Sequence, residues 1–215
     1  MATQYNNNNS SLESFSFGAS ASFGSFVSPS IYNTNSRTQM LSAAQASLGT
    51  ATAVHAAVND NGASQTISTG LTQPGAPRNM VVTPSGTATV AGTVVINGTD
   101  YAGQAISESF AFAVGALASM VGNKAFKSVS SIVQPALGAG VSATYGTGNK
   151  LGFGGYLYGN TVLQAFLGGV KESAAPTVTT SLTSLSSNTY TLASALNGSS
   201  VAISFELSFD QSLVG

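Results

Sequence analysis

The sequence carries very little charge and has neither cysteine nor tryptophan. Its 215 residues include six Lys or Arg, seven Asp or Glu and one histidine, for a formal net charge of -1. Charged residues make up 6% of the chain, about a quarter of the fraction in an ordinary soluble domain. Without cysteine, disulfides, thiolate metal ligands and cysteine nucleophiles are excluded. Without a basic excess to hold phosphates, we expect no nucleic-acid partner.

Long hydrophobic runs are also missing. The longest apolar stretch, residues 110–121, is about half as long as a membrane-spanning helix and is interrupted by Gly and Ser. The first residues lack the basic and apolar regions of a secretory signal. We therefore expect no membrane partner and synthesis in the cytoplasm. The near-zero net charge lowers repulsion between copies, which favours a homo-oligomer.

The residues that are present form short alternating runs rich in Gly, Ser, Thr, Ala, Val and Asn. Alternation of apolar and polar residues is clearest at 104–113 and 201–210 and predicts two strands with one buried face each. The pairs Asn97-Gly98 and Asn197-Gly198 predict turns. We expect a mainly β protein, an antiparallel β-sandwich or barrel-like domain, with at most one or two short helices. The candidate helices are residues 38–48 and 161–170.

The composition divides the chain into three parts. Residues 1–40 are predicted to form an extended Phe/Ser/Asn-rich arm, 41–77 a peripheral helix or strand with a Pro-rich connector, and 78–215 a compact β domain. A disordered tail and an interface arm are both compatible with the first part. We favour the arm, because phenylalanines in a free tail would remain exposed to water. Its proposed interface anchors are Phe15, Phe17, Phe23 and Phe26.

The search for chemistry finds no catalytic or metal-binding pattern. His55 is the only histidine and sits in an apolar run, so it lacks the partners of a metal site. Residues 146–152 resemble a phosphate loop without its spacing and are most simply a β-turn. We expect no enzyme activity, catalytic residue, cofactor or metal. Arg78 stands out among the few cations and is expected to be an interface or structural residue that binds backbone carbonyls or a carboxylate.

An ordered series of short motifs resembles a family of structural proteins from tailed bacteriophages, whose members are mostly described as virion or head proteins. The resemblance covers about residues 50–207 and implies a particle component present in many copies, without catalytic residues. Residues 113–121 are longer and more apolar than expected at this turn, which makes them a candidate contact particular to this chain. The motifs lie at residues 73–83, 92–100, 103–109, 122–129, 148–152, 175–179 and 196–198.

Three functions remain open at this level. The leading hypothesis is a capsid decoration or cement protein on the virion surface, whose partners are the major capsid protein and copies of itself. A tail, neck or baseplate component built from the same β domain is the second. The third is a host-glycan-binding adhesin, in which exposed aromatic side chains stack on sugar rings, the candidates being Tyr145, Phe153, Tyr156 and Tyr158.

Overall fold

The structure is a computed structural model that describes residues 36–207, and it is mainly β, as predicted. Strands make up 48% of it and every strand pair is antiparallel. In the described part the helical content is short 3-10 structure, including η3 (Leu185–Ser187). The strands are β1 (Ser36–Leu41), β2 (His55–Asn59), β3 (Gln65–Ile67), β4 (Arg78–Ser85), β5 (Gly92–Thr99), β6 (Ala105–Phe112), β7 (Met120–Phe126), β8 (Ser128–Gln134), β9 (Ser142–Gly152), β10 (Val162–Leu167), β11 (Val170–Lys171), β12 (Thr177–Thr179), β13 (Thr189–Thr191) and β14 (Val201–Glu206).

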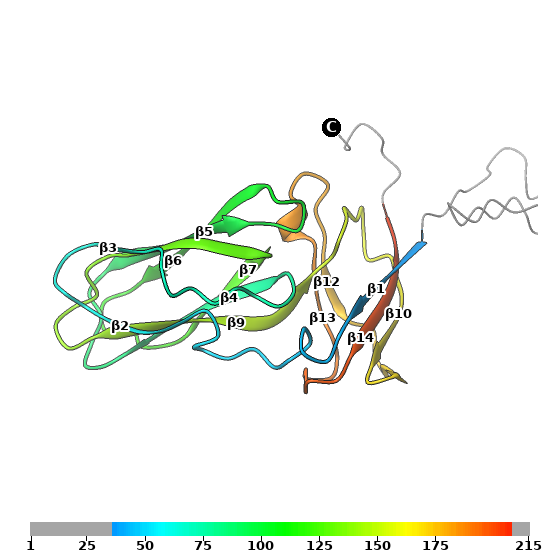
Figure 1. Cartoon of the computed structure of the whole chain (residues 1–215), viewed down its shortest axis with the longest axis horizontal. Helices are drawn as coiled ribbons and strands as arrows, with labels where there is room; N and C mark the ends of the chain where they lie inside the picture. Colours follow the sequence, from blue (N-terminus) through cyan, green and yellow to red (C-terminus); the bar gives the residue numbers. More distant parts are fainter. Residues whose placement is uncertain (1–35, 208–215) are drawn as a thin grey trace, which may run out of the picture.

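The strands form three sheets (Figure 1). The long sheet has the order β12-β13-β9-β4-β7, and β2 also pairs with β9. The cover sheet, β3-β8-β5-β6, lies over the part of the long sheet at the left of Figure 1. The end sheet, β1-β14-β10-β11, stands at the right, beyond β12 and β13. β9 runs from the left end of the molecule to its middle, where its last residues pair with β13 (Figure 1).

The distal lobe is the sandwich of the cover sheet on the long sheet. Its core takes alternate residues from both layers, as expected where each strand buries one face. Strand β5 contributes Val94 and Ile96, while β4 contributes Met80 and Val82 from the opposite layer, and all four are fully buried. The rest of this core is Val54, Phe110, Phe112, Phe126, Val129, Ile132, Leu137, Val141, Ala143 and Tyr145.

The proximal lobe packs the end sheet against the other end of the long sheet. Strand β14 contributes Val201, Ile203 and Phe205 to its core. The ring of Phe153 lies 4.7 Å from that of Tyr190 and 4.8 Å from that of Phe205, measured between centroids. Pairs at such spacings add about 0.5–1.5 kcal/mol beyond the burial of their area. The lobe therefore has an aromatic centre of its own.

Two alternating segments form the strands that their patterns predict. In β6, Phe110 and Phe112 are buried while Ser107, Ser109 and Ala111 are exposed. In β14, Val201 is the first of three buried residues that alternate with half-buried ones. The strand ends at Glu206 in the described part of the chain. The periodicity of two thus identified both strands and their inward faces.

The two expected helices are wrong. Residues 36–41 are β1, which pairs with β14 along its whole length, and only a single turn follows it, closed by Ala46 N–H on the Ser42 carbonyl at 2.9 Å. Residues 162–167 are β10, on the other side of β14. Both segments flank a strongly alternating strand and complete its sheet. This tertiary pairing outweighs a weak helix propensity.

One predicted turn is confirmed and the other is wrong. Gly198 has φ +79° and Ser199 N–H donates to Asn197 Oδ1 at 3.0 Å, a turn stabilised by the Asn side chain. Gly98 instead lies inside β5, opposite Ile106. A Cβ atom there would collide with the backbone carbonyl of Ser128 on the neighbouring strand. The glycine permits a close approach of two strands rather than a turn.

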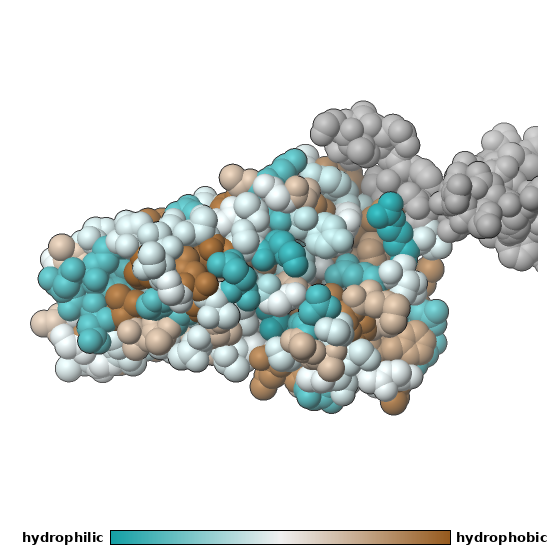
Figure 2. All heavy atoms as spheres, viewed as in Figure 1, coloured by the Kyte–Doolittle hydropathy of each residue, from teal (hydrophilic) through white to brown (hydrophobic). Residues whose placement is uncertain are grey.

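Residues 36–77 belong to the sheets. They supply β1 to the end sheet, β2 to the long sheet and β3 to the cover sheet. Residues 36–40, predicted to be part of the arm, thus lie in β1 of the end sheet, and residues 41–77, expected to be peripheral, supply β2 and β3 of the distal lobe. Figure 2 shows a surface of mostly pale residues of intermediate hydropathy, between separate brown and teal groups. This reflects the abundance of Ser, Thr, Gly and Ala and the low charge.

Candidate functional site

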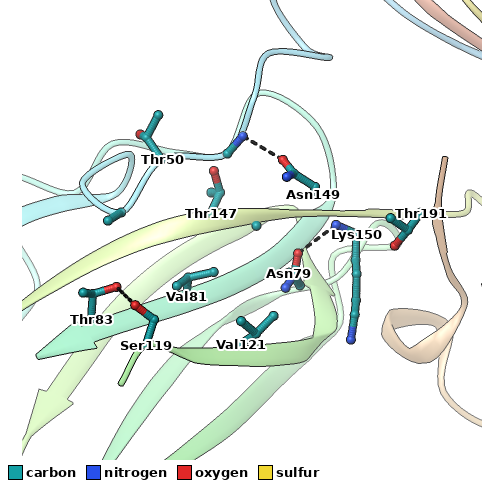
Figure 3. Close-up of a pocket in the computed structure, with 13 residues that line it drawn as sticks. Thr50, Asn79, Val81, Thr83, Ser119, Val121, Thr147, Asn149, Lys150 and Thr191 are labelled. Carbon is teal, nitrogen blue, oxygen red and sulfur yellow. Dashed lines mark hydrogen bonds between the residues drawn. The ribbon is translucent and has the colours of Figure 1, made fainter. Parts of the chain in front are cut away.

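A groove of about 430 Å³ runs over the long sheet at the junction of the two lobes (Figure 3). The segment 49–51 forms one wall above β9, and side chains of β4 and of residues 119–121 form the other. The lining combines hydroxyls, amides, backbone groups and one ammonium with two valines. The residues are Gly49, Thr50, Ala51, Asn79, Val81, Thr83, Ser119, Val121, Thr147, Gly148, Asn149, Lys150 and Thr191.

The upper wall lies directly on the backbone of β9. Thr147 N–H donates to the Thr50 carbonyl at 3.1 Å, and Gly49 N–H donates to Asn149 Oδ1 at 2.9 Å. A Cβ atom on Gly146 would collide with the Thr50 carbonyl and the backbone of Ala51. The expectation of a β-turn at 146–152 is therefore wrong. These glycines lie in a strand and leave room for a second chain segment on top of it.

Asn79 is the central polar residue of the groove and is fully buried. Its Nδ2 donates to the Gly122 carbonyl at 3.0 Å, and its Oδ1 accepts the Lys150 backbone N–H at 3.0 Å. A side chain at Gly148 would overlap the Asn79 amide. The amide thus joins β7 to β9 across β4, at the place where the register of β4 shifts against both neighbours. Asn79 satisfies backbone groups that the irregular ladders leave unpaired.

The irregular stretch of β7 beside the groove is closed by a carboxylate from the cover sheet. Glu108 Oε1 accepts the backbone N–H of Asn123 at 2.6 Å and that of Lys124 at 3.3 Å. Lys124 Nζ donates to the Ser107 carbonyl at 2.8 Å. Lys150 Nζ donates to Asn123 Oδ1 at 2.6 Å. Charged groups therefore hold the outer edge of β7 in one geometry, and hydrogen bonds of this type are stronger than neutral ones.

Arg78 lies below the groove at the start of β4 and is only 3% exposed. Its Nη2 donates to the Ser47 carbonyl at 3.0 Å, while Nε is buried and has no hydrogen-bond partner among residues 36–207. Burial lowers the pKa of the guanidinium, and the nearby Tyr190 opposes that effect. Arg78 ties the segment before the groove to the proximal lobe. Its contact is with a backbone carbonyl, one of the two partner types expected from the sequence.

The aromatic residues proposed for sugar stacking do not form one surface. Tyr145 is fully buried in the distal lobe and Phe153 in the proximal lobe. Tyr156 is half-buried, and Tyr158 is exposed. The stacking platform expected for an adhesin is therefore not assembled from these four residues.

His55 lies in β2, where its Nδ1 is 2.9 Å from the Ala56 carbonyl. Within residues 36–207, no group of three His, Asp or Glu side chains is placed to hold a metal ion. No helix in the same range is long and apolar enough to cross a membrane. The proposed arm anchors Phe15, Phe17, Phe23 and Phe26 lie outside the described residues.

Comparisons with known proteins find no matching family model, no matching curated protein and no matching solved structure. The groove itself was missed at the level of sequence, although one signal for it exists. Gly146, Gly148 and Gly152 are spaced closely within one strand-forming run, and such glycines mark places where another backbone comes close. What the sequence could not identify is the approaching segment, 49–51, because it lies about a hundred residues earlier.

The arrangement suits hydrogen bonding to a polar, mostly neutral partner. Threonine and serine hydroxyls and the Lys150 ammonium line the groove, and Val81 and Val121 add apolar contact beside them. Val121 is 57% exposed although it lies in a strand of the long sheet. An extended polypeptide segment presents the same mixture of backbone groups and small side chains.

Proposed function

We propose that this chain is a structural component of a tailed bacteriophage particle, a decoration or cement protein on the capsid surface. Its partners are the major capsid protein and other copies of the chain. The observation that carries the proposal is the ordered series of motifs across about residues 50–207 that resembles virion structural proteins. The chain needs no catalytic centre, cofactor or metal for this function, since it acts by binding.

The position of the motifs in the fold supports this proposal. Residues 73–83 lead into and form most of β4, 92–100 form β5, 103–109 form most of β6, and 122–129 form most of β7. The other three motifs lie at the end of β9, over β12 and in the turn before β14. The ordered series therefore covers strands of both lobes, with most of its length in the distal lobe.

The surface chemistry supports a broad and weakly charged contact. Hydroxyl and amide groups line the groove, and Lys150 is its only charged residue. Such a surface forms wet interfaces through many modest hydrogen bonds. A protein on a repeating lattice gains from this, because several weak contacts made together produce avidity without one tight site. The groove, together with the N-terminal arm, accounts for attachment at more than one point.

The direct test uses capsids and tails that lack the chain, each incubated with the purified full-length protein. We expect saturable binding to capsids, measured by co-sedimentation, and no binding to isolated tails. Binding to tails alone would favour a tail, neck or baseplate component and contradict the decoration function. Absence of binding to both would contradict the virion proposal as a whole.

The arm is tested in the same assay by replacing its aromatic anchors together: Phe15→Ser, Phe17→Ser, Phe23→Ser and Phe26→Ser. Because buried aromatic residues dominate the energy of interfaces, we expect capsid affinity to fall at least about tenfold. The matched control replaces neighbouring serines with alanine: Ser14→Ala, Ser16→Ala, Ser22→Ala and Ser25→Ala. Equal binding by both variants would show that the phenylalanines are not anchors.

A further inference from the structure

Four loops gather at one end of the molecule, at the left of Figure 1. They join β2 to β3, β4 to β5, β6 to β7 and β8 to β9. The registers place them together, since Ser142 at the start of β9 lies opposite both Asn59 and Ser85. We call this surface the distal tip. It comprises residues 60–64, 86–91, 113–119 and 135–141.

The distal tip is held rigidly by hydrogen bonds between its loops. Thr89, which is buried, donates through Oγ1 to the carbonyls of Ala113 at 2.7 Å and Ala116 at 2.9 Å. Val90 N–H donates to the Leu137 carbonyl at 2.7 Å. Leu137 N–H in turn donates to Asp60 Oδ1 at 2.8 Å. All four loops are thus connected, and a surface fixed in advance loses little conformational entropy when it binds.

This rigid surface presents aliphatic side chains to water. Val114 is 78% exposed, and Val90 and Leu117 are also exposed. Residues 113–121 are the apolar segment that the sequence singled out as a candidate contact. Asp60 is the only formally charged residue in the four loops. Exposed aliphatic groups on a rigid and almost uncharged surface are typical of an interaction site.

The opposite end of the molecule carries a second apolar surface. On the outer face of the end sheet, Met40 lies opposite Ala202 on β14, which lies opposite Phe166 on β10. None of the three belongs to the core of the proximal lobe, and Met40 is 74% exposed. Lys171 is the strand partner of Phe166 and ends the row. We call Met40, Ala202, Phe166 and Lys171 the end row.

The chain enters and leaves the end sheet away from the end row. Ser36 and Glu206 are paired at one edge of the sheet, and Met40 and Ala202 are paired four residues further along. Four residues of a strand span about 13 Å. The segments that continue from Ser36 and Glu206 therefore start at a distance from the row.

We propose that the distal tip of one copy docks on the end row of the next, so that this chain assembles head to tail. The two surfaces match in chemistry, because each is apolar at its centre and neither buries an unpaired charge in the contact. The single charged residue of each is opposite in sign, Asp60 on the tip and Lys171 on the row. Because the two surfaces are different, the contact is heterologous and produces rings or filaments.

The experiment measures the mass of the purified full-length chain by sedimentation across a concentration series up to about 1 mM. We expect species larger than the 21.4 kDa single chain to grow with concentration. Val114→Asp removes the tip and Met40→Asp removes the end row, and each variant alone should stay monomeric. When mixed, the first still has an intact row and the second an intact tip. The mixture should therefore form a dimer and no larger species.

The control is Leu48→Asp, which changes another exposed aliphatic residue, 51% exposed, that lies neither in the groove lining nor in either end surface. It should assemble like the wild type. Circular dichroism and the thermal midpoint verify that all three variants fold, as expected for substitutions at exposed positions. A monomeric wild type, equal loss of assembly in all three variants, or a dimer formed by Met40→Asp alone would each overturn the proposal. The assembly needs only this chain, so it does not depend on the proposed place in a phage particle.

Discussion

The two lobes share β9 but are built from different parts of the chain. In the distal lobe, β5 and β6 are neighbours joined by the short turn 100–104, which Asp100 closes by accepting the N–H groups of Ala102 and Gln104. In the proximal lobe, β1 pairs with β14 from the other end of the sequence. Contacts between neighbouring segments form faster than contacts across a long chain. The distal lobe therefore combines a local pair, β5–β6, with longer-range pairs such as β4–β9, whereas the β1–β14 pair of the proximal lobe joins both ends of the described chain.

The lobes also differ in the hydrogen bonding of their buried tyrosine hydroxyls. In the distal lobe, the Tyr145 hydroxyl donates to Gln134 Oε1. In the proximal lobe, the Tyr190 hydroxyl has no hydrogen-bond partner among residues 36–207, and the same is true of Nε of the neighbouring Arg78. A buried polar group without a partner costs free energy. The distal lobe also has one such atom, Gln134 Nε2, so the difference between the lobes concerns the two tyrosine hydroxyls rather than all buried polar groups of residues 36–207.

The largest expected loss of stability comes from a cavity made in the core of the proximal lobe alone. Phe205→Ala removes a ring that is 1% exposed and packs against Phe153, so we expect the free energy of unfolding to fall by about 3–5 kcal/mol. Hydrogen exchange should accelerate most in β1, β10 and β14, while β5 and β6 keep more of their protection. If hydrogen exchange accelerates equally in both lobes, the lobes open as one unit, which would contradict the expected difference between them.

A smaller effect comes from the close strand approach in the distal lobe. Gly98→Ala places a methyl group against the Ser128 carbonyl, so we expect a loss of about 1–3 kcal/mol in the free energy of unfolding. The matched control is Gly159→Ala, where no atom lies within 4 Å of the added Cβ. That change should remain within about 0.5 kcal/mol. Urea unfolding of both variants measures the difference, and equal midpoints would refute the reason given for Gly98.

The two tyrosines test the contrast in polar satisfaction. Tyr145→Phe leaves Gln134 Oε1 without its donor, so we expect a loss of about 1–2 kcal/mol. Tyr190→Phe removes a hydroxyl that makes no hydrogen bond, and its effect should be within about 0.5 kcal/mol or slightly stabilising. Urea unfolding at neutral pH measures the change in the free energy of unfolding for both variants. A larger loss for Tyr190→Phe would show that its hydroxyl has a partner in solution.

The smallest effect is on alkaline stability. Burial raises the pKa of Tyr145 and of Tyr190 above their usual value of about 10. The folded state then holds these protons more tightly than the unfolded chain, so stability is full below about pH 10 and decreases as pH rises above it. Each Tyr→Phe variant should weaken this decrease, measured as unfolding midpoints from about pH 9 to about pH 11. If neither variant changes the loss of stability at high pH, groups other than these two tyrosines cause it.

The sequence predicts strands well where alternation is strong. β6 and β14 were found, with their buried faces, because each has one wet and one dry side. β1 and β10 were missed, because their residues favour helix about as well as strand and their partner β14 lies far from both in the sequence. The turn predicted at Asn97-Gly98 was wrong for a related reason. The pair forms turns well, but here it meets β8, and no local signal shows that.

The candidate site was harder to predict than the fold. The glycines of 146–152 were visible, but their function depends on the segment 49–51 that lies on them. Asn79 follows Arg78 in an ordinary-looking strand start, and its importance arises from the irregular registers of β4 with both neighbours. Such irregularities are set by packing across the sheet. Composition, by contrast, indicated the low surface charge directly.

A reconstruction of the intact phage particle at side-chain resolution is the most direct test of the proposal that this chain is a capsid-bound structural protein. We expect density for the two lobes on the capsid lattice, with Phe15, Phe17, Phe23 and Phe26 buried against a neighbouring subunit. Density for this chain confined to the neck or tail, or its absence from the particle, would contradict the proposal.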